Sequence, residues 1–264
     1  MSDQADNVTP FSQSDMSKTQ QVKAKTPAGS LAALLASPKM KSQFAAALPK
    51  HMTPERMVRI VTTEIRKTPA LVSCDQNSFL GAVIQCAQLG LEPGNSLGHA
   101  YILPYGKQAQ LIIGYRGMIE LARRSGQIIS IAARTVREDD FFEYEFGLDE
   151  GLRHKPSEES TESRITHVYA VAKLHGGGQQ FEVMSSNQVE AVRSQSKAGK
   201  SGPWVSHWEE MAKKTVIRRL FKYLPVSVEI QKAVMLDEKA DAGVNQENEY
   251  VFDGDYEVIG DGEE

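Results

Sequence analysis

Apolar residues recur at three- and four-residue intervals in several segments of the chain, and this spacing predicts helices with one buried face. The predicted helices cover residues 30–35, 39–48, 53–67, 76–89, 118–125, 187–194, 202–225 and 226–238. Thr53 and Asp75 are suited to cap two of them, because their side chains can accept hydrogen bonds from the free N–H groups of the first turn. The pattern therefore places helices at both ends of the chain.

In the middle of the chain the period shortens to two, which is typical of strands. Residues 99–105 and 109–115 flank Gly106 and Lys107, and this arrangement predicts a β-hairpin with Lys107 near its tip. Further strands are predicted at residues 128–136, 141–146, 166–174 and 180–184, with residues 147–163 as an acidic, polar connection. The expected fold class is α+β, a mixed core in which helices pack on a β-hairpin and a small antiparallel sheet.

Residues 202–225 hold both tryptophans and the densest basic run of the chain, and the spacing predicts a single helix. Lys214, Arg218 and Lys222 form a stripe at four-residue spacing along it, with Arg219 beside them. Between residues 213 and 225 there are five cations and no carboxylate, so ordinary i, i+4 ion pairing is unavailable there. The stripe is either a solvated face or a surface that a polyanion neutralises.

Charge is distributed unevenly along the 264 residues, although the net charge is only −4. Residues 237–264 carry eleven carboxylates and one lysine, whereas residues 1–236 carry 29 Lys and Arg against 23 Asp and Glu. We therefore expect a disordered N-terminal arm at residues 1–28, a folded core at 29–236, and an acidic flexible tail at 237–264. The tail could compete with another polyanion for basic side chains or recruit a partner.

Signatures of catalysis are absent from the sequence. Gly199, Lys200 and Ser201 resemble the end of a phosphate-binding loop, but Ser194 stands where that loop requires glycine. The histidines and the two cysteines lack metal-ligand spacing, so we expect no metal, no cofactor and no enzymatic activity. The N-terminal residues lack a signal peptide pattern, which predicts a cytoplasmic protein.

Basic and aromatic residues together favour nucleic-acid binding. Lysine and arginine neutralise phosphates without reading sequence, and aromatic rings give bases a stacking surface. Trp204 and Trp208 are candidate base-stacking residues, with burial in the core as the alternative. Arg56, Arg59 and Arg66 form a second basic row, for which a solvated face is the alternative to phosphate contact.

Five segments in order carry a resemblance to the RecT family of phage and prophage single-strand annealing proteins, over roughly residues 30–236. They are Leu89-Gly-Leu-Glu-Pro-Gly94, Gly98-His-Ala-Tyr101, Leu111-Ile-Ile-Gly-Tyr-Arg-Gly-Met118, Ala122-Arg-Arg-Ser-Gly126, and Met211-Ala-Lys-Lys-Thr215 with Ile217-Arg-Arg219.

The resemblance implies a protein that binds single-stranded DNA and anneals complementary strands without ATP. It further implies strand invasion in some settings, assembly into rings or helical filaments, and action beside a 5′→3′ exonuclease and a host single-strand binding protein. The implied core is a mixed α/β domain, distantly related to the lambda phage annealing protein, with DNA in a basic groove that continues across subunits.

Together, the basic residues and the resemblance predict contacts to the DNA backbone. The predicted contacts are Lys107, Arg116, Arg123, Arg124, Lys197, Lys200, Lys214, Arg218, Arg219 and Lys222. Two other classes of function stay open, a metal-dependent nuclease and a structural scaffold that binds an acidic protein partner.

Overall fold

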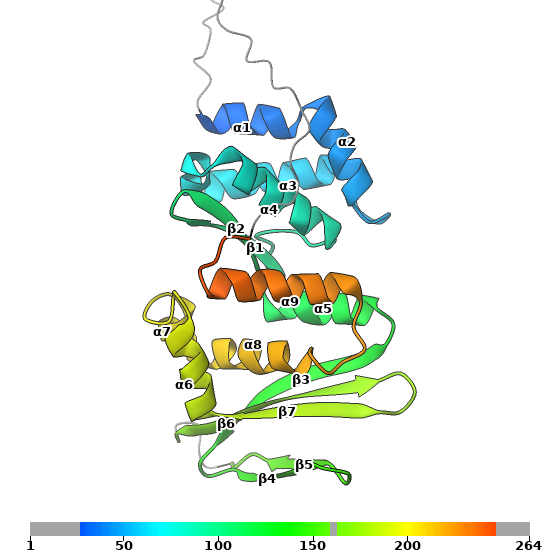
Figure 1. Cartoon of the computed structure of the whole chain (residues 1–264), viewed down its shortest axis with the longest axis vertical. Helices are drawn as coiled ribbons and strands as arrows, with labels where there is room; N and C mark the ends of the chain where they lie inside the picture. Colours follow the sequence, from blue (N-terminus) through cyan, green and yellow to red (C-terminus); the bar gives the residue numbers. More distant parts are fainter. Residues whose placement is uncertain (1–26, 159–162, 247–264) are drawn as a thin grey trace, which may run out of the picture.

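The fold of the chain is elongated: α1 lies at one end, β4 and β5 at the other, and the C-terminal helices α8 and α9 return to the middle (Figure 1). The computed structural model describes residues 27–158 and 163–246; most of the predicted N-terminal arm and residues 247–264 of the predicted tail lie outside them. Helices and small antiparallel sheets make up the described part, so the predicted α+β class is confirmed.

One end of the molecule is helical. It comprises α1 (Pro27–Leu35), α2 (Pro38–Ala47), α3 (Pro54–Lys67), the 3₁₀ helix η2 (Pro69–Ser73) and α4 (Gln76–Gln88). The predicted caps are present: the Thr53 side chain accepts from the Arg56 N–H at 3.3 Å, and the Asp75 carboxylate accepts from the Ser78 N–H at 2.8 Å. Helix α4 carries no charged residue and is buried on nearly all sides, as its composition predicts.

The predicted hairpin packs against α4. Strands β1 (Ala100–Tyr105) and β2 (Gln108–Ile113) pair antiparallel around Gly106, whose φ of +63° suits a tight turn. The Ser78 hydroxyl accepts the Ala109 N–H at 2.9 Å, so the start of α4 is tied to β2. Lys107 is left exposed at the turn.

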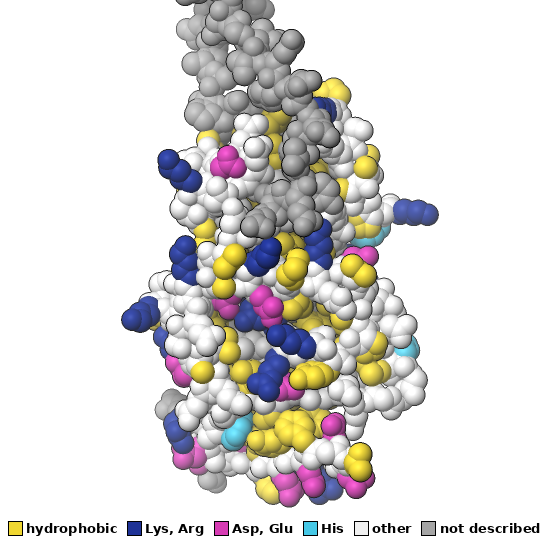
Figure 2. Space-filling view, in the orientation of Figure 1, with side chains coloured by type: hydrophobic (Ala, Val, Ile, Leu, Met, Phe, Trp, Pro, Cys, Tyr) yellow, Lys and Arg dark blue, Asp and Glu magenta, His cyan; other side chains and the backbone are white. Residues whose placement is uncertain are grey.

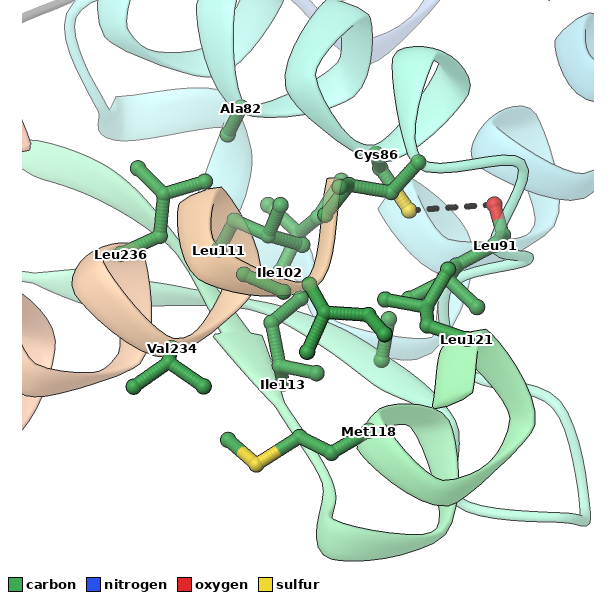
Figure 3. Close-up of a cluster of buried hydrophobic side chains, with 14 of the residues drawn as sticks. Ala82, Cys86, Leu91, Ile102, Leu111, Ile113, Met118, Leu121, Val234 and Leu236 are labelled. Carbon is green, nitrogen blue, oxygen red and sulfur yellow. Dashed lines mark hydrogen bonds between the residues drawn. The ribbon is translucent and has the colours of Figure 1, made fainter. Parts of the chain in front are cut away.

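Helices α5 (Tyr115–Arg124) and α9 (Val228–Asp241) form the middle of the molecule. Figure 3 shows Val234 and Leu236 of α9 in one buried cluster with Ile113 of β2 and Met118 of α5. The chain after α9 is also fixed, because the Gln246 side-chain amide accepts from the Leu111 N–H at 2.8 Å and donates to the Leu111 carbonyl at 2.7 Å. The ordered core therefore continues past residue 236, where the sequence analysis began the flexible tail.

The second half of the chain is built on a three-stranded antiparallel sheet. Strands β3 (Ile128–Arg137), β6 (Ile165–Leu174) and β7 (Gln179–Ser185) lie in the order β3-β6-β7. Helices α6 (Ser186–Gln195), α7 (Pro203–Ser206) and α8 (Trp208–Leu220) follow, and α8 packs against all three strands. Buried Val168, Ala170 and Ala172 of β6 belong to the same core as Val216 and Ile217 of α8.

A second hairpin lies at the opposite end from α1 (Figure 1). It comprises β4 (Phe141–Glu145) and β5 (Gly151–Lys155), and β5 falls inside the segment that the sequence analysis took for a polar connection. The predicted connection was wrong because only two side chains of β5, Leu152 and His154, are partly buried. An alternation of two residues is too short to distinguish a strand from a polar loop. Phe142 and Leu152 pack on a small separate cluster around Tyr169 and Phe181.

Gly117 lets the backbone of α5 lie against the backbone of His99, and we expect this contact to contribute to stability. A Cβ there would collide with the His99 carbonyl oxygen, although replacing glycine by alanine within a helix normally adds about 1 kcal/mol of stability. We expect Gly117→Ala to lower the free energy of unfolding by about 1–3 kcal/mol in chemical denaturation. Gly151→Ala is the matched control, because its Cβ would enter open space. Equal stability of the two variants would contradict the close approach.

Candidate nucleic-acid interface

The basic stripe of α8 faces α9. The Lys214 Nζ lies 2.6 Å from the Asp237 Oδ1, and the Arg218 guanidinium spans Asp237 at 3.2 Å and Asp241 at 3.1 Å. These side chains are nearly enclosed, since Lys214 is 13% exposed, Arg218 11% and Asp237 1%. The two cations are thus part of a buried ion-pair network between helices.

The remaining cations of the stripe are paired nearer the surface. Lys222 lies 3.3 Å from Glu238 of α9, and Arg219 lies 2.6 Å from Glu182 of β7. Lys222 and Arg219 stay 60% and 43% exposed. The stripe has no carboxylate partner within α8, as the sequence indicates, and its partners come instead from two other elements, α9 and β7.

The predicted helix at residues 202–225 is divided. It begins with the short helix α7, breaks at His207 (φ −143°, ψ 53°), and continues as α8, which ends at Leu220. The break lets the two indoles take different environments. Trp204 is buried in the core at 1% exposure, whereas Trp208 is half-buried and its Nε1 donates to the Glu190 carboxylate at 2.5 Å.

A buried Trp204 cannot offer its ring to a base in this conformation. The stacking prediction is therefore wrong for Trp204 on grounds of burial, and it stays a prediction for Trp208.

The two arginines at the end of α5 differ in their partners. Arg124 Nη1 donates to the carbonyls of Leu89 (3.2 Å) and Gly90 (2.9 Å), and its Nε donates to Glu120 at 3.1 Å. Arg124 therefore closes the C-terminus of α4, where four carbonyls lack helical partners. Arg123 is exposed and makes no ion pair within the described part of the chain.

Arg116 is exposed at the first turn of α5 and lies over the Tyr115 ring, 5.9 Å from its centroid. Its hydrogen bond with Tyr115 raises the pKa of the guanidinium. Nearby, burial alone would raise the pKa of Glu210, but hydrogen bonds from Lys213 and Tyr115 and the charge of Arg116 outweigh it, so the pKa is lowered. The first turns of α5 and α8 thus meet at the Glu210 carboxylate, whose negative charge Lys213 and Arg116 compensate.

Three predicted lysines lie in the turn of the first hairpin and in the loop after α6, and we call Lys107, Lys197 and Lys200 the lysine corner. The Lys197 N–H donates to the Asp241 carbonyl at 3.0 Å, and its ammonium lies 6.0 Å from the Tyr105 ring centroid. Lys107 follows Tyr105 by two residues, and Lys200 follows Lys197 by three in a loop that Arg193 holds by donating to the Gly199 carbonyl at 2.8 Å. All three are exposed, and none pairs with a carboxylate of residues 27–158 or 163–246.

The second basic row, on α3, is only partly paired. Arg56 lies 2.5 Å from Glu92, and Glu64 pairs with Lys67, so Arg56 takes its partner from outside α3. Arg59 and Arg66 are exposed without an ion pair in the described ranges. Phosphate contact therefore stays one of the two interpretations of this row.

Within the described residues no group of three or more His, Cys, Asp and Glu side chains could hold a metal ion. In the same ranges no helix combines the length and apolar character required to cross a bilayer.

Comparison with known proteins identifies the family. The profile of the RecT family matches residues 55–251. The chain is 58% identical to Protein RecT of Escherichia coli (strain K12) over 265 residues, which covers 97% of this chain and 98% of that protein. The chain belongs to the RecT family.

Membership of the RecT family confirms the expected function, a single-stranded DNA annealing protein of homologous recombination. The chain is also 29% identical to the uncharacterized protein YqaK of Bacillus subtilis (strain 168) over 217 residues, which covers 82% of this chain and 75% of YqaK. The family match ends at residue 251 and so includes α9 and Gln246, in agreement with their place in the core.

The α8–α9 network generates a prediction about stability. We expect Asp237→Asn to lower the free energy of unfolding by about 3–5 kcal/mol, because it leaves the buried charges of Lys214 and Arg218 without full compensation. Glu238→Gln is the matched control on the same helix and should cost less than about 1 kcal/mol, since it breaks only an exposed pair. Urea denaturation checks both, and a similar small loss in the two variants would show that the Asp237 network contributes little.

Proposed function

We propose that each subunit holds one DNA strand by its phosphates at the lysine corner and at Arg116 and Arg123, while the bases stay readable. The observation that carries this assignment is that no carboxylate of residues 27–158 or 163–246 pairs with the lysine corner, in contrast to the paired stripe on α8. Cations without internal partners can neutralise phosphates at no cost in broken ion pairs. Backbone contacts suit annealing, because they position a strand without occupying its base edges.

Arg219 and Lys222 take part in the same proposal in a weaker role. Their pairs with Glu182 and Glu238 are exposed, and such pairs contribute about 0–1 kcal/mol, so a phosphate can replace the carboxylate. Lys214, Arg218 and Arg124 are assigned instead to positioning, because their charged groups are held by α9 or by the end of α4.

The proposed protein works as a homo-oligomer in which neighbouring subunits continue the DNA track as a ring or a helical filament. It acts without ATP, cofactor or catalytic residue, in the cytoplasm. A 5′→3′ exonuclease would expose the strand, and a host single-strand binding protein is a further partner. These assignments rest on the family and on the free cations at the surface.

Salt dependence tests the lysine corner. For single strands the slope of log K against log[salt] falls by about 0.7 for each phosphate contact that is lost. We expect Lys197→Gln and Lys200→Gln each to reduce the slope by about 0.7 in fluorescence anisotropy with a labelled oligonucleotide. Lys50→Gln is the control, because this exposed lysine lies at the helical end between α2 and α3, and its slope should match the wild type. Unchanged slopes in both lysine-corner variants would contradict the proposed site.

Strand length separates annealing from the alternative of a nuclease. Complementary labelled oligonucleotides incubated with the protein and Mg²⁺, without ATP, should form a duplex with both strands intact on a denaturing gel. Shortened strands would establish a nuclease instead. Absence of DNA binding at moderate salt would favour a scaffold for an acidic protein partner.

A further inference from the structure

The tip of the second hairpin exposes apolar and acidic side chains together. Tyr144 is 41% exposed, Phe146 52%, and Leu148 fully exposed. Glu145, Asp149 and Glu150 lie among them, and residues 144–150 contain no cation. We call residues 144–150 the hairpin tip. Exposed apolar side chains grouped in this way mark an interaction surface.

The base of this hairpin is firmly held. The Asp140 carboxylate lies 3.0 Å from the His154 Nε2 and accepts N–H groups from Arg137 at 2.7 Å and Ser157 at 2.9 Å. Burial alone would raise the pKa of Asp140, but these hydrogen bonds and His154 outweigh it and lower the pKa. The tip therefore projects from a fixed base, with Phe146 stacked on Phe181 at 5.1 Å between centroids.

Nucleic acid is a poor occupant for the hairpin tip, because three carboxylates repel phosphates. None of the three pairs with a cation of the described residues. A surface that combines aromatic rings with carboxylates is complementary to arginine, which forms ion pairs with the acids and cation–π contacts with the rings.

Such arginines lie at the opposite end of the same molecule (Figure 1). Residues 38–67 carry seven Lys and Arg against two Glu. Arg59 and Arg66 of α3 are exposed and without ion pairs in the described ranges, and their seven-residue spacing places them on one face, roughly 10 Å apart. The hairpin tip and the Arg59 and Arg66 face are thus opposite in charge, and the space-filling view shows acidic and apolar side chains, with some cations among them, at the hairpin end (Figure 2).

We propose that the hairpin tip of one subunit docks on the Arg59 and Arg66 face of α3 in a second copy of this chain. Two different surfaces then meet at every contact, so the interface is heterologous and repeats from copy to copy. Repetition of a heterologous contact produces a ring if it closes and a helical filament if it does not. This inference rests on the homo-oligomer of the proposed function and assigns the surfaces that build it.

Charge exchange tests the interface. One variant reverses the tip (Glu145→Lys, Asp149→Lys and Glu150→Lys), and a second reverses the helix face (Arg59→Glu and Arg66→Glu). We expect each alone to sediment as small species with an unchanged circular dichroism spectrum. An equimolar mixture should recover large assemblies, because each variant then offers the other a complementary charge. One chain with all five substitutions should recover them alone.

Two further variants serve as controls for the charge-reversal experiment. Glu138→Lys with Asp139→Lys changes exposed acids at the base of the hairpin and should assemble like the wild type. Leu148→Arg replaces a side chain without packing partners and should weaken assembly even if the charge variants fold poorly.

Three outcomes would overturn the interface. They are wild-type assembly of the tip variant or the helix-face variant, a mixture of the two that forms no large assemblies, and an equal loss of assembly in the Glu138→Lys, Asp139→Lys variant. Affinity for a short oligonucleotide, measured on the dispersed variants, separates the two proposals. If the mixture forms large assemblies but the variants do not bind DNA, the proposed function alone is contradicted. If the variants bind DNA but the mixture forms no large assemblies, the interface alone is contradicted.

Discussion

The pairing of Arg218 and Lys214 with Asp237 and Asp241 is the interaction on which the rest of the structure depends. It joins α8, which lies on the three-stranded sheet, to α9, which packs on β2 and α5. The two halves of the molecule are therefore connected by a buried network of charges as well as by apolar contact. Such a network is costly when one partner is lost, because the remaining buried charges are then left without compensation.

This network also divides the cations of the chain into two sets. Cations that hold the fold have carboxylate or carbonyl partners, as Arg218 and Arg124 do. Cations that are exposed and have no such partner among the described residues, as in the lysine corner and at Arg59 and Arg66 of α3, are available to other molecules. The richest basic run of the sequence, on α8, is thus the one most engaged internally.

Local patterns explain which parts of the fold were predictable. The caps at Thr53 and Asp75 and the turn at Gly106 depend on neighbours within four residues, so the sequence shows both partners together. Strand β5 exposes most of its side chains and gives only a weak alternation. The partners of the α8 stripe are more distant: Asp237 lies 19 residues beyond Arg218, and Glu182 comes from a strand before α8. No local rule selects them, because only the packing of α8 on α9 and β7 brings them together.

The same geometry changes how the acidic C-terminal region is understood. By composition, residues 237–264 form one block of negative charge that could compete with DNA. Asp237 and Asp241 are instead internal counter-ions, and Gln246 fills hydrogen-bonding positions beside β2. Removing residues from 237 onward would thus leave Arg218 without its carboxylate partners and truncate α9. Removing residues after Gln246 takes away eight carboxylates and none of these contacts. Competition with DNA is therefore a question about residues 247–264 alone, because the acids before them are already neutralised within the fold.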